Sequence, residues 1–135
     1  MKIVLDTNVF ISGVFFSGFP FKILEAWRDR HLGVVVSAEI LEEYRRVGVR
    51  LSREYPGVDL DPFLALLAVE AEVVLAPPLP ESVCEDPDDD KFIACALASR
   101  CKVIVSGDKL LRKISGYQGI EILSPTRFVE HHLKK

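Results

Sequence analysis

The chain has 135 residues, of which 49% are hydrophobic and 27% are charged, and its formal net charge is −3. This length and balance predict one folded domain over residues 1–135 and exclude an intrinsically disordered chain. No apolar run approaches the roughly 18 residues of a membrane span, and Asp6 and Asn8 interrupt the first run too early for a signal peptide. We therefore expect a cytoplasmic protein that does not associate with a membrane.

Short apolar runs alternate with helix-like segments along the whole chain. In chain order, the pattern predicts strand 2–5, helix 7–15, helix 20–31, strand 34–36, a helix from the cap Ser37 to about Glu54, and a helix from Asp59 or Asp61 to about Glu70. It continues with strand 72–75, helix 89–100, strand 102–106, helix 108–114, strand 120–123, and a last helix that begins at Ser124-Pro125 and reaches about Leu133. This alternation predicts an α/β fold, a three-layer α/β/α sandwich with a mainly parallel five-stranded sheet.

Acidic side chains occur at four places along these elements. They are Asp6 after the first strand, Glu39, Glu42 and Glu43 after the second, Asp86 and Asp88–Asp90 at the start of helix 89–100, and Asp108 after strand 102–106. Ligands of such sheets bind beyond the carboxyl ends of the strands, so we expect Asp6 and Asp108 to share one site. Carboxylates gathered in one place repel one another. The pattern therefore indicates a hard divalent metal ion and phosphate chemistry.

Helical spacing separates the acids of helix 37–54 from one another. Its apolar stripe consists of Ile40, Tyr44, Val47 and Leu51. Glu42 points nearly opposite to this stripe, into solvent, whereas Glu43 lies at its edge, where a catalytic carboxylate belongs. The same test does not separate Asp89 from Asp90, which flank the stripe of helix 89–100 at comparable angles. Capping of that helix is the alternative role for either of them.

Four motifs in chain order resemble those of the PIN domain, a metal-dependent ribonuclease fold. They are Asp6-Thr7-Asn8-Val9, the segment Ser37–Val47 with its acid at Glu43, the segment Asp86–Asp90 with the following Lys-Phe-Ile-Ala, and Ser106-Gly107-Asp108. The resemblance implies a catalytic set of Asp6, Glu43, Asp89 and Asp108. It also implies that Mg²⁺ or Mn²⁺ is bound by Asp6, Asp108 and either Asp89 or Asp90, with Thr7, Asn8 and Ser106 in support.

Within this family, the chain is most similar to the toxins of type II toxin–antitoxin pairs, such as VapC. That similarity implies an endoribonuclease with an RNA substrate, an antitoxin protein as partner, and a homodimer or higher oligomer. The apolar faces of helices 20–31 and 59–70 are the candidates for such contacts. The third motif of that branch usually reads Asp-Asp-Asn, so Asp90 adds an acid beside the expected one.

Positively charged side chains follow two of the acidic positions and are candidates for contacts with an RNA backbone. They are Arg45, Arg46 and Arg50 in helix 37–54, and Lys109 and Arg112 after Asp108. Their alternative role is that of ordinary solvated helix faces.

Two other functions stay open at this point. The first is a PIN-like fold that binds RNA or protein without cleaving RNA. A rise in the stability of the protein on addition of a metal ion would argue against this alternative. The second is a phosphotransfer domain, which also uses an aspartate after its first strand. Such domains need a lysine after a later strand, whereas Lys102 precedes its strand and Lys109 follows Asp108 directly.

Overall fold

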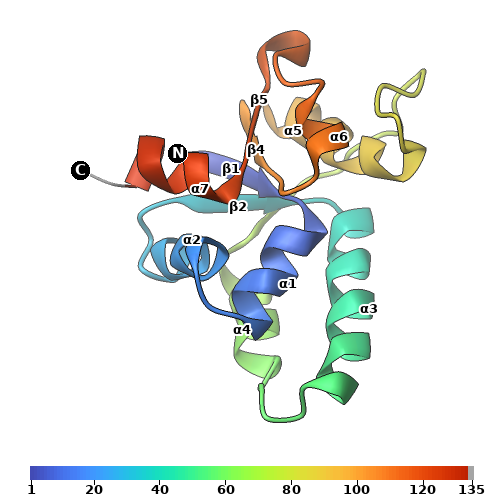
Figure 1. The fold of residues 1–135 in the computed structure, drawn as a ribbon. Helices are drawn as coiled ribbons and strands as arrows, with labels where there is room; N and C mark the ends of the chain where they lie inside the picture. Colours follow the sequence, from blue (N-terminus) through green and yellow to red (C-terminus); the bar gives the residue numbers. More distant parts are fainter. Residues whose placement is uncertain (134–135) are drawn as a thin grey trace.

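A five-stranded parallel sheet forms the centre of the protein (Figure 1). The computed structural model describes residues 1–133. The strands are β1 (Lys2–Leu5), β2 (Gly33–Val36), β3 (Glu72–Val73), β4 (Val103–Val105) and β5 (Glu121–Leu123), in the spatial order β3-β2-β1-β4-β5. All four strand pairings are parallel, and Leu5 lies opposite Val105 in the register of β1 and β4. The α/β class and the parallel five-stranded sheet predicted from the sequence are confirmed.

Helices cover both faces of the sheet. The helices are α1 (Thr7–Phe15), α2 (Phe19–Arg28), α3 (Ala38–Glu54), α4 (Asp61–Glu70), α5 (Asp90–Ser99), α6 (Lys109–Arg112) and α7 (Pro125–Phe128). In Figure 1, α1 to α4 lie below β1 and β2, while α5 and α6 lie above these two strands and beside β4 and β5. A 3₁₀ turn, Pro87–Asp89, leads into α5, and a π-helical turn, Val129–Leu133, follows α7. The central strands read as unbroken apolar runs because helices bury both of their faces.

Several predicted elements are shorter than the sequence pattern indicates. Strand 72–75 is reduced to Glu72–Val73, and although the amide of Val74 still donates to the carbonyl of Val36, Pro77 and Pro78 then remove the donors that pairing needs. Helix 108–114 is reduced to Lys109–Arg112 and is followed by a turn at Gly116, whose φ is 100°. Ser106 lies beyond the end of β4 rather than within it. That position frees its side chain for the site described below.

Helices α1 and α2 pack closely because Gly13 has no side chain. A Cβ atom at this position would lie 2.6 Å from Cδ1 of Leu24 and 2.9 Å from the carbonyl oxygen of Pro20. Within residues 1–133, no single helix is long and apolar enough to cross a membrane. Only α1 and α2 taken together meet that criterion, and the chain bends by 89° between them.

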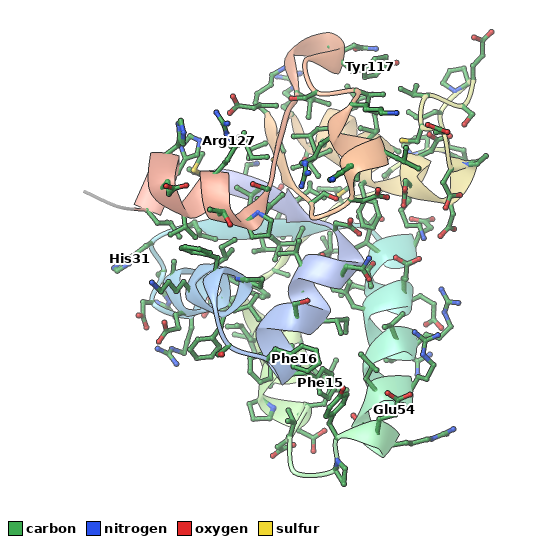
Figure 2. The ribbon with its side chains drawn as sticks, in the orientation of Figure 1. Phe15, Phe16, His31, Glu54, Tyr117 and Arg127 are labelled. Atoms are coloured by element: carbon green, nitrogen blue, oxygen red, sulfur yellow. The ribbon has the colours of Figure 1, made fainter. Side chains whose placement is uncertain are left out.

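An aromatic cluster joins the end of α1 to the end of α3, away from the sheet (Figure 2). The ring of Tyr55, just after α3, lies 6.0 Å from that of Phe15 and 5.3 Å from that of Phe16. These contacts tie the end of α3 to the end of α1. They therefore help to fix the direction in which α3 presents Glu43 at its other end.

Candidate functional site

Asp6 is held rigidly at the carboxyl end of β1. Its backbone amide donates to the carbonyl of Val105 at 2.9 Å, so the parallel pairing with β4 extends to this residue. The side chain is only 5% exposed, and Oγ of Ser106 donates to its Oδ2 at 2.6 Å. The same Ser106 Oγ accepts from the amide of Asp108 at 3.0 Å. Ser106, which is fully buried, therefore connects the two acids that follow β1 and β4.

Asp108 begins α6 and is half-buried. Its Oδ1 accepts from the amide of Leu110 at 2.9 Å, so the carboxylate caps the helix. Nη1 of Arg112 donates to the carbonyl of Ser106 at 3.3 Å, which ties α6 back to the end of β4. Asp108 therefore both caps α6 and belongs to the acidic site.

The charges of these acids act on one another. Burial raises the pKa of Asp6; the hydrogen bond from Ser106 opposes this rise, while the nearby charges of Asp108 and Glu43 add to it. Burial also raises the pKa of Asp89 to about 7, and the charges of Asp6 and Asp108 contribute to the rise. Asp6 is therefore within electrostatic reach of three carboxylates from other parts of the chain, Glu43, Asp89 and Asp108.

Glu43 is enclosed by protein groups on both of its oxygens. The hydroxyl of Thr7 donates to Oε2, Nζ of Lys91 contacts Oε1, and Nη2 of Arg46 lies 3.7 Å from Oε1. The Glu43 side chain is 12% exposed. Glu42, by contrast, is exposed and pairs with Arg45 at 2.9 Å. The structure thus separates the two glutamates into an inner and a solvent-facing one.

The other acids of the third cluster accept from local backbone amides or pair with Lys91. Oδ1 of Asp90 accepts from the amides of Cys84 at 2.8 Å and Val83 at 3.2 Å. Burial raises the pKa of Asp90, but these hydrogen bonds outweigh it and hold the pKa below its ordinary value. Asp86 accepts from the amide of Asp88 at 3.0 Å. Of this cluster, Asp89 is therefore the acid that the structure couples to Asp6 and Asp108.

Comparison with known proteins identifies the family of the chain. The profile of the PIN domain family matches residues 2–110. The chain belongs to the PIN domain family. PIN domains are typically nucleases. An uncharacterized protein of Methanocaldococcus jannaschii, MJ1680, is 33% identical over 146 residues, and the match covers 99% of this chain and 93% of that protein.

A solved structure of the PIN domain endonuclease Utp24 also aligns with the chain. The TM-score is 0.46 with 18% sequence identity, and the alignment covers 91% of this chain and 84% of that chain. This similarity is too distant to bear on the activity of the present PIN domain.

The acids of this PIN domain suit a hard divalent cation by their chemistry. Asp6, Asp89 and Asp108 all offer carboxylate oxygen, which Mg²⁺ and Mn²⁺ prefer. Among the side chains of residues 1–133, however, no three His, Cys, Asp or Glu are grouped tightly enough to hold an ion directly. Mg²⁺ usually keeps several waters and needs only one or two carboxylates, so the donor set fits a water-mediated site.

Two further residues of the site were not predicted from the sequence. Lys91 contacts Glu43 from α5, and Tyr44 donates from α3 to the carbonyl of Leu5, directly before Asp6. The position of Lys91 directly after a run of aspartates is the sequence feature that could have identified it. Tyr44 was predicted only as a member of the apolar stripe, and nothing in the spacing indicates where its hydroxyl points.

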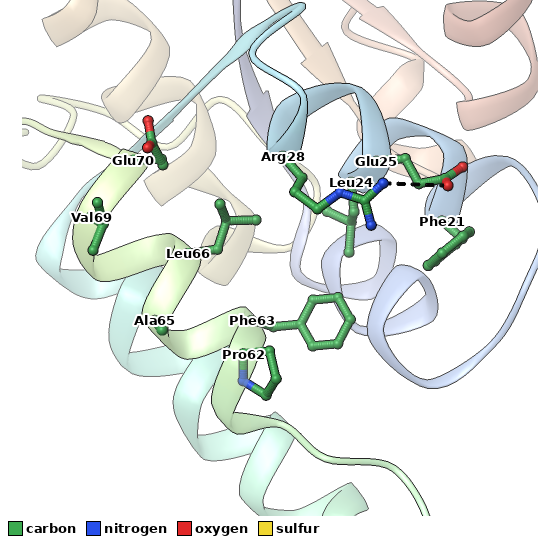
Figure 3. A pocket seen from close by; sticks show the side chains of 10 residues that line it. All are labelled: Phe21, Leu24, Glu25, Arg28, Pro62, Phe63, Ala65, Leu66, Val69 and Glu70. Carbon is green, nitrogen blue, oxygen red and sulfur yellow. Dashed lines mark ion pairs between the residues drawn. The ribbon is translucent and has the colours of Figure 1, made fainter.

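An apolar groove of about 400 Å³ lies between α2 and α4, apart from the acids (Figure 3). Phe21, Leu24, Phe63, Leu66 and Val69 line it, and the ion pair of Glu25 and Arg28, 3.7 Å apart, borders it. This groove lies between the helices that the sequence indicates as candidate contact surfaces.

The raised pKa of Asp89 makes the stability of the metal-free protein depend on pH. Because the folded-state pKa is about 7 and the ordinary value is 3.8, the folded protein binds this proton more tightly than the unfolded chain. The contribution of Asp89 to stability is therefore lost as pH rises from 3.8 to about 7. We therefore expect Asp89→Asn to gain melting temperature in EDTA relative to the wild type as pH rises over this range. Equal slopes for the two proteins would contradict the proposed coupling.

Proposed function

We propose that this PIN domain is a Mg²⁺- or Mn²⁺-dependent endoribonuclease. The observation that carries the proposal is the buried Asp6, whose carboxylate is coupled electrostatically to those of Asp89 and Asp108 beyond the ends of β1 and β4. Such crowding is relieved when a divalent cation binds, and phosphate esters are the substrates that such cations serve best. Asp6, Asp89 and Asp108 are the candidate ligands.

The residues of the chain prepare this site in several ways. Ser106 fixes one oxygen of Asp6, and its link to the amide of Asp108 sets the position of the second acid. Thr7 orients Glu43. Held by these residues, a divalent ion would supply Lewis-acid stabilisation of negative charge on the scissile phosphate. The protein contributes a carboxylate frame in which Asp6 and Asp108 are placed by the paired strands β1 and β4, and Asp89 by the turn that leads into α5.

The direct test of this proposal is cleavage of a circular, structured RNA with Mn²⁺. A circle has no ends, so conversion to a linear product demonstrates endonucleolytic cleavage. We expect linear RNA with Mn²⁺ or Mg²⁺ and none with EDTA, while a DNA circle of the same sequence reports the preference for ribose. RNA binding without any linear product would favour the non-catalytic scaffold instead.

We propose that RNA approaches along α3. Arg45, Arg46 and Arg50 form a ridge with Arg53 beside Glu42, bordering a shallow depression on this helix. Arg45, Arg46 and Arg50 are exposed, and Nη2 of Arg46 lies 3.7 Å from Oε1 of Glu43. On α6, Lys109 is also exposed, whereas Arg112 donates to the backbone at Ser106. The arginines of α3 are therefore available to phosphates close to the acidic site.

Removal of two of these arginines should reduce the salt dependence of RNA binding. For Arg45→Ala/Arg50→Ala, we expect weaker binding and a slope of log K against log salt that is smaller by roughly 1.4, about 0.7 per lost phosphate contact. Binding is measured in EDTA so that no RNA is cleaved. Arg28→Ala, an exposed arginine at the α2–α4 groove, is the matched control. An unchanged slope in the double variant would place the RNA elsewhere.

We further propose that the nuclease is the toxin of a toxin–antitoxin pair and acts on cytoplasmic RNA. The resemblance of its four motifs to that branch supports the role, and the groove between α2 and α4 offers an apolar surface for an antitoxin or a second copy. Induced expression should arrest growth of a bacterial host, whereas the Asp6→Asn variant should not. Light scattering of the purified protein tests for the homodimer or higher oligomer. If the cells grow normally although they contain active nuclease, the toxin role is wrong. The proposed nuclease activity would not be affected by that result.

A further inference from the structure

Lys91 occupies an unusual position for a lysine. It lies in the first turn of α5, directly after the acidic cluster, and its side chain is only 15% exposed. Its Nζ lies 2.5 Å from Oε1 of Glu43 and 3.1 Å from Oδ1 of Asp88. Glu43 and Lys91 are 48 residues apart in the sequence. The pair therefore joins α3 to α5 at the end of the molecule that carries the candidate metal ligands.

This ion pair differs from the other pairs on the protein. Glu42 and Arg45 are 59% and 60% exposed, and such solvated pairs contribute little to stability. Glu43 and Lys91 are both largely removed from water, where loss of one partner leaves an uncompensated charge. Asp88, the second partner of Lys91, is 70% exposed. Glu43 is thus the carboxylate that depends on Lys91.

Both oxygens of Glu43 are already in use. Oε1 contacts Lys91 and Oε2 accepts from Thr7, while no comparable cation pairs with Asp6 or Asp89 among the ion pairs of residues 1–133. The acidic site therefore has two halves. One half is neutralised by a side chain, and the other retains mutually repelling carboxylates.

We propose that Lys91 is a positioning residue that acts as a resident cation: it neutralises Glu43, holds it off the metal, and confines the ion to Asp6, Asp89 and Asp108. This inference rests on the proposed metal-dependent function. A divalent cation near the ammonium group is repelled by it and attracted by Glu43, so the two charges of the pair nearly cancel at the metal. Removal of either charge alone must change metal affinity, and the two changes must have opposite signs.

Titration of the RNA-free protein with Mn²⁺ in a calorimeter tests the inference. Lys91→Met removes the repelling charge and frees Glu43, so we expect Mn²⁺ to bind roughly tenfold more tightly. Glu43→Gln leaves Lys91 with only the exposed Asp88 as a partner, so we expect roughly tenfold weaker binding. The double variant Lys91→Met/Glu43→Gln should return close to the wild-type affinity, and Lys91→Arg should retain it. Lys22→Met, an exposed lysine on α2, should leave it unchanged.

The outcomes separate this inference from the proposed function. If the wild type binds Mn²⁺ but Lys91→Met and Glu43→Gln shift its affinity in the same direction or not at all, Lys91 is only a structural tie and the inference is wrong. If the wild type binds no Mn²⁺, the proposed function fails and the inference with it. Melting curves show whether Lys91→Met folds. Should it not fold, weaker binding by Glu43→Gln together with near-wild-type binding by the double variant and by Lys91→Arg would support the inference, whereas equally weak binding by Glu43→Gln and the double variant would overturn it.

Discussion

Replacement of Asp6 by Asn should reduce Mn²⁺-dependent RNA cleavage on the order of a hundredfold or more, because a metal ligand contributes at least as much as its hydrogen-bonded supports. Asn has the same shape as Asp, and its side-chain oxygen can still accept from Ser106. The change therefore removes the charge and leaves the packing of this buried position in place. Initial cleavage rates on the circular RNA measure the effect.

The same substitution should stabilise the metal-free protein. The buried carboxylate of Asp6 is repelled by Asp108 and Glu43, and a neutral side chain removes that repulsion. We expect a higher melting temperature in EDTA and a smaller increase on addition of Mn²⁺. Glu42→Gln is the matched control, since it removes one exposed charge from the end of α3 that also carries Glu43. If Asp6→Asn cleaves RNA at a rate within about threefold of the wild-type rate, the proposed site is wrong.

Replacement of Tyr44 by Ala should be the most damaging single change to stability at this end of the fold, at about 3–5 kcal/mol. Tyr44 is fully buried and stacks on Phe10, with ring centroids 4.4 Å apart and an angle of 8° between the rings. Its hydroxyl donates to the carbonyl of Leu5 at 2.5 Å. The side chain thus holds α3 against α1 and fixes the backbone that immediately precedes Asp6.

Tyr44→Phe separates the two contributions of this side chain. The ring and its stacking remain, so we expect a loss of only about 1–3 kcal/mol from the Leu5 carbonyl that is left without its donor. Urea denaturation in EDTA gives both free energies of unfolding. A cost for Tyr44→Ala no larger than that for Tyr44→Phe would show that the ring does not carry the packing described for it.

The fold could be predicted from the sequence because its signals are local. The unbroken runs Ile3-Val4-Leu5 and Val34-Val35-Val36 mark doubly covered strands, and both are buried. Ser37 begins α3 as a helix cap should, with its hydroxyl accepting from the amide of Ile40 at 3.3 Å. The length of β3 was predicted less well. Its two residues are exposed at the edge of the sheet, where apolar character says little about pairing.

The candidate site could be predicted only in part, because its decisive contacts are between distant residues. The positions of Asp6 and Asp108 follow from the rule that parallel strands deliver their carboxyl ends to one edge. The choice between Asp89 and Asp90 depends on the loop at Val83 and Cys84, whose amides turn toward Asp90. Likewise, the partner of Lys91 lies on another helix. Neither contact leaves a periodic trace in the sequence.

The hydrogen bond from Ser106 to Asp6 spans 100 residues of chain. The strand β4, which pairs with β1 on that side, likewise lies far along the chain from Asp6. During synthesis, the acidic site therefore cannot assemble until β4 and Ser106 have followed Asp6 out of the ribosome. For the ribonuclease proposed above, this order would delay any cleavage of RNA until that later segment has been made.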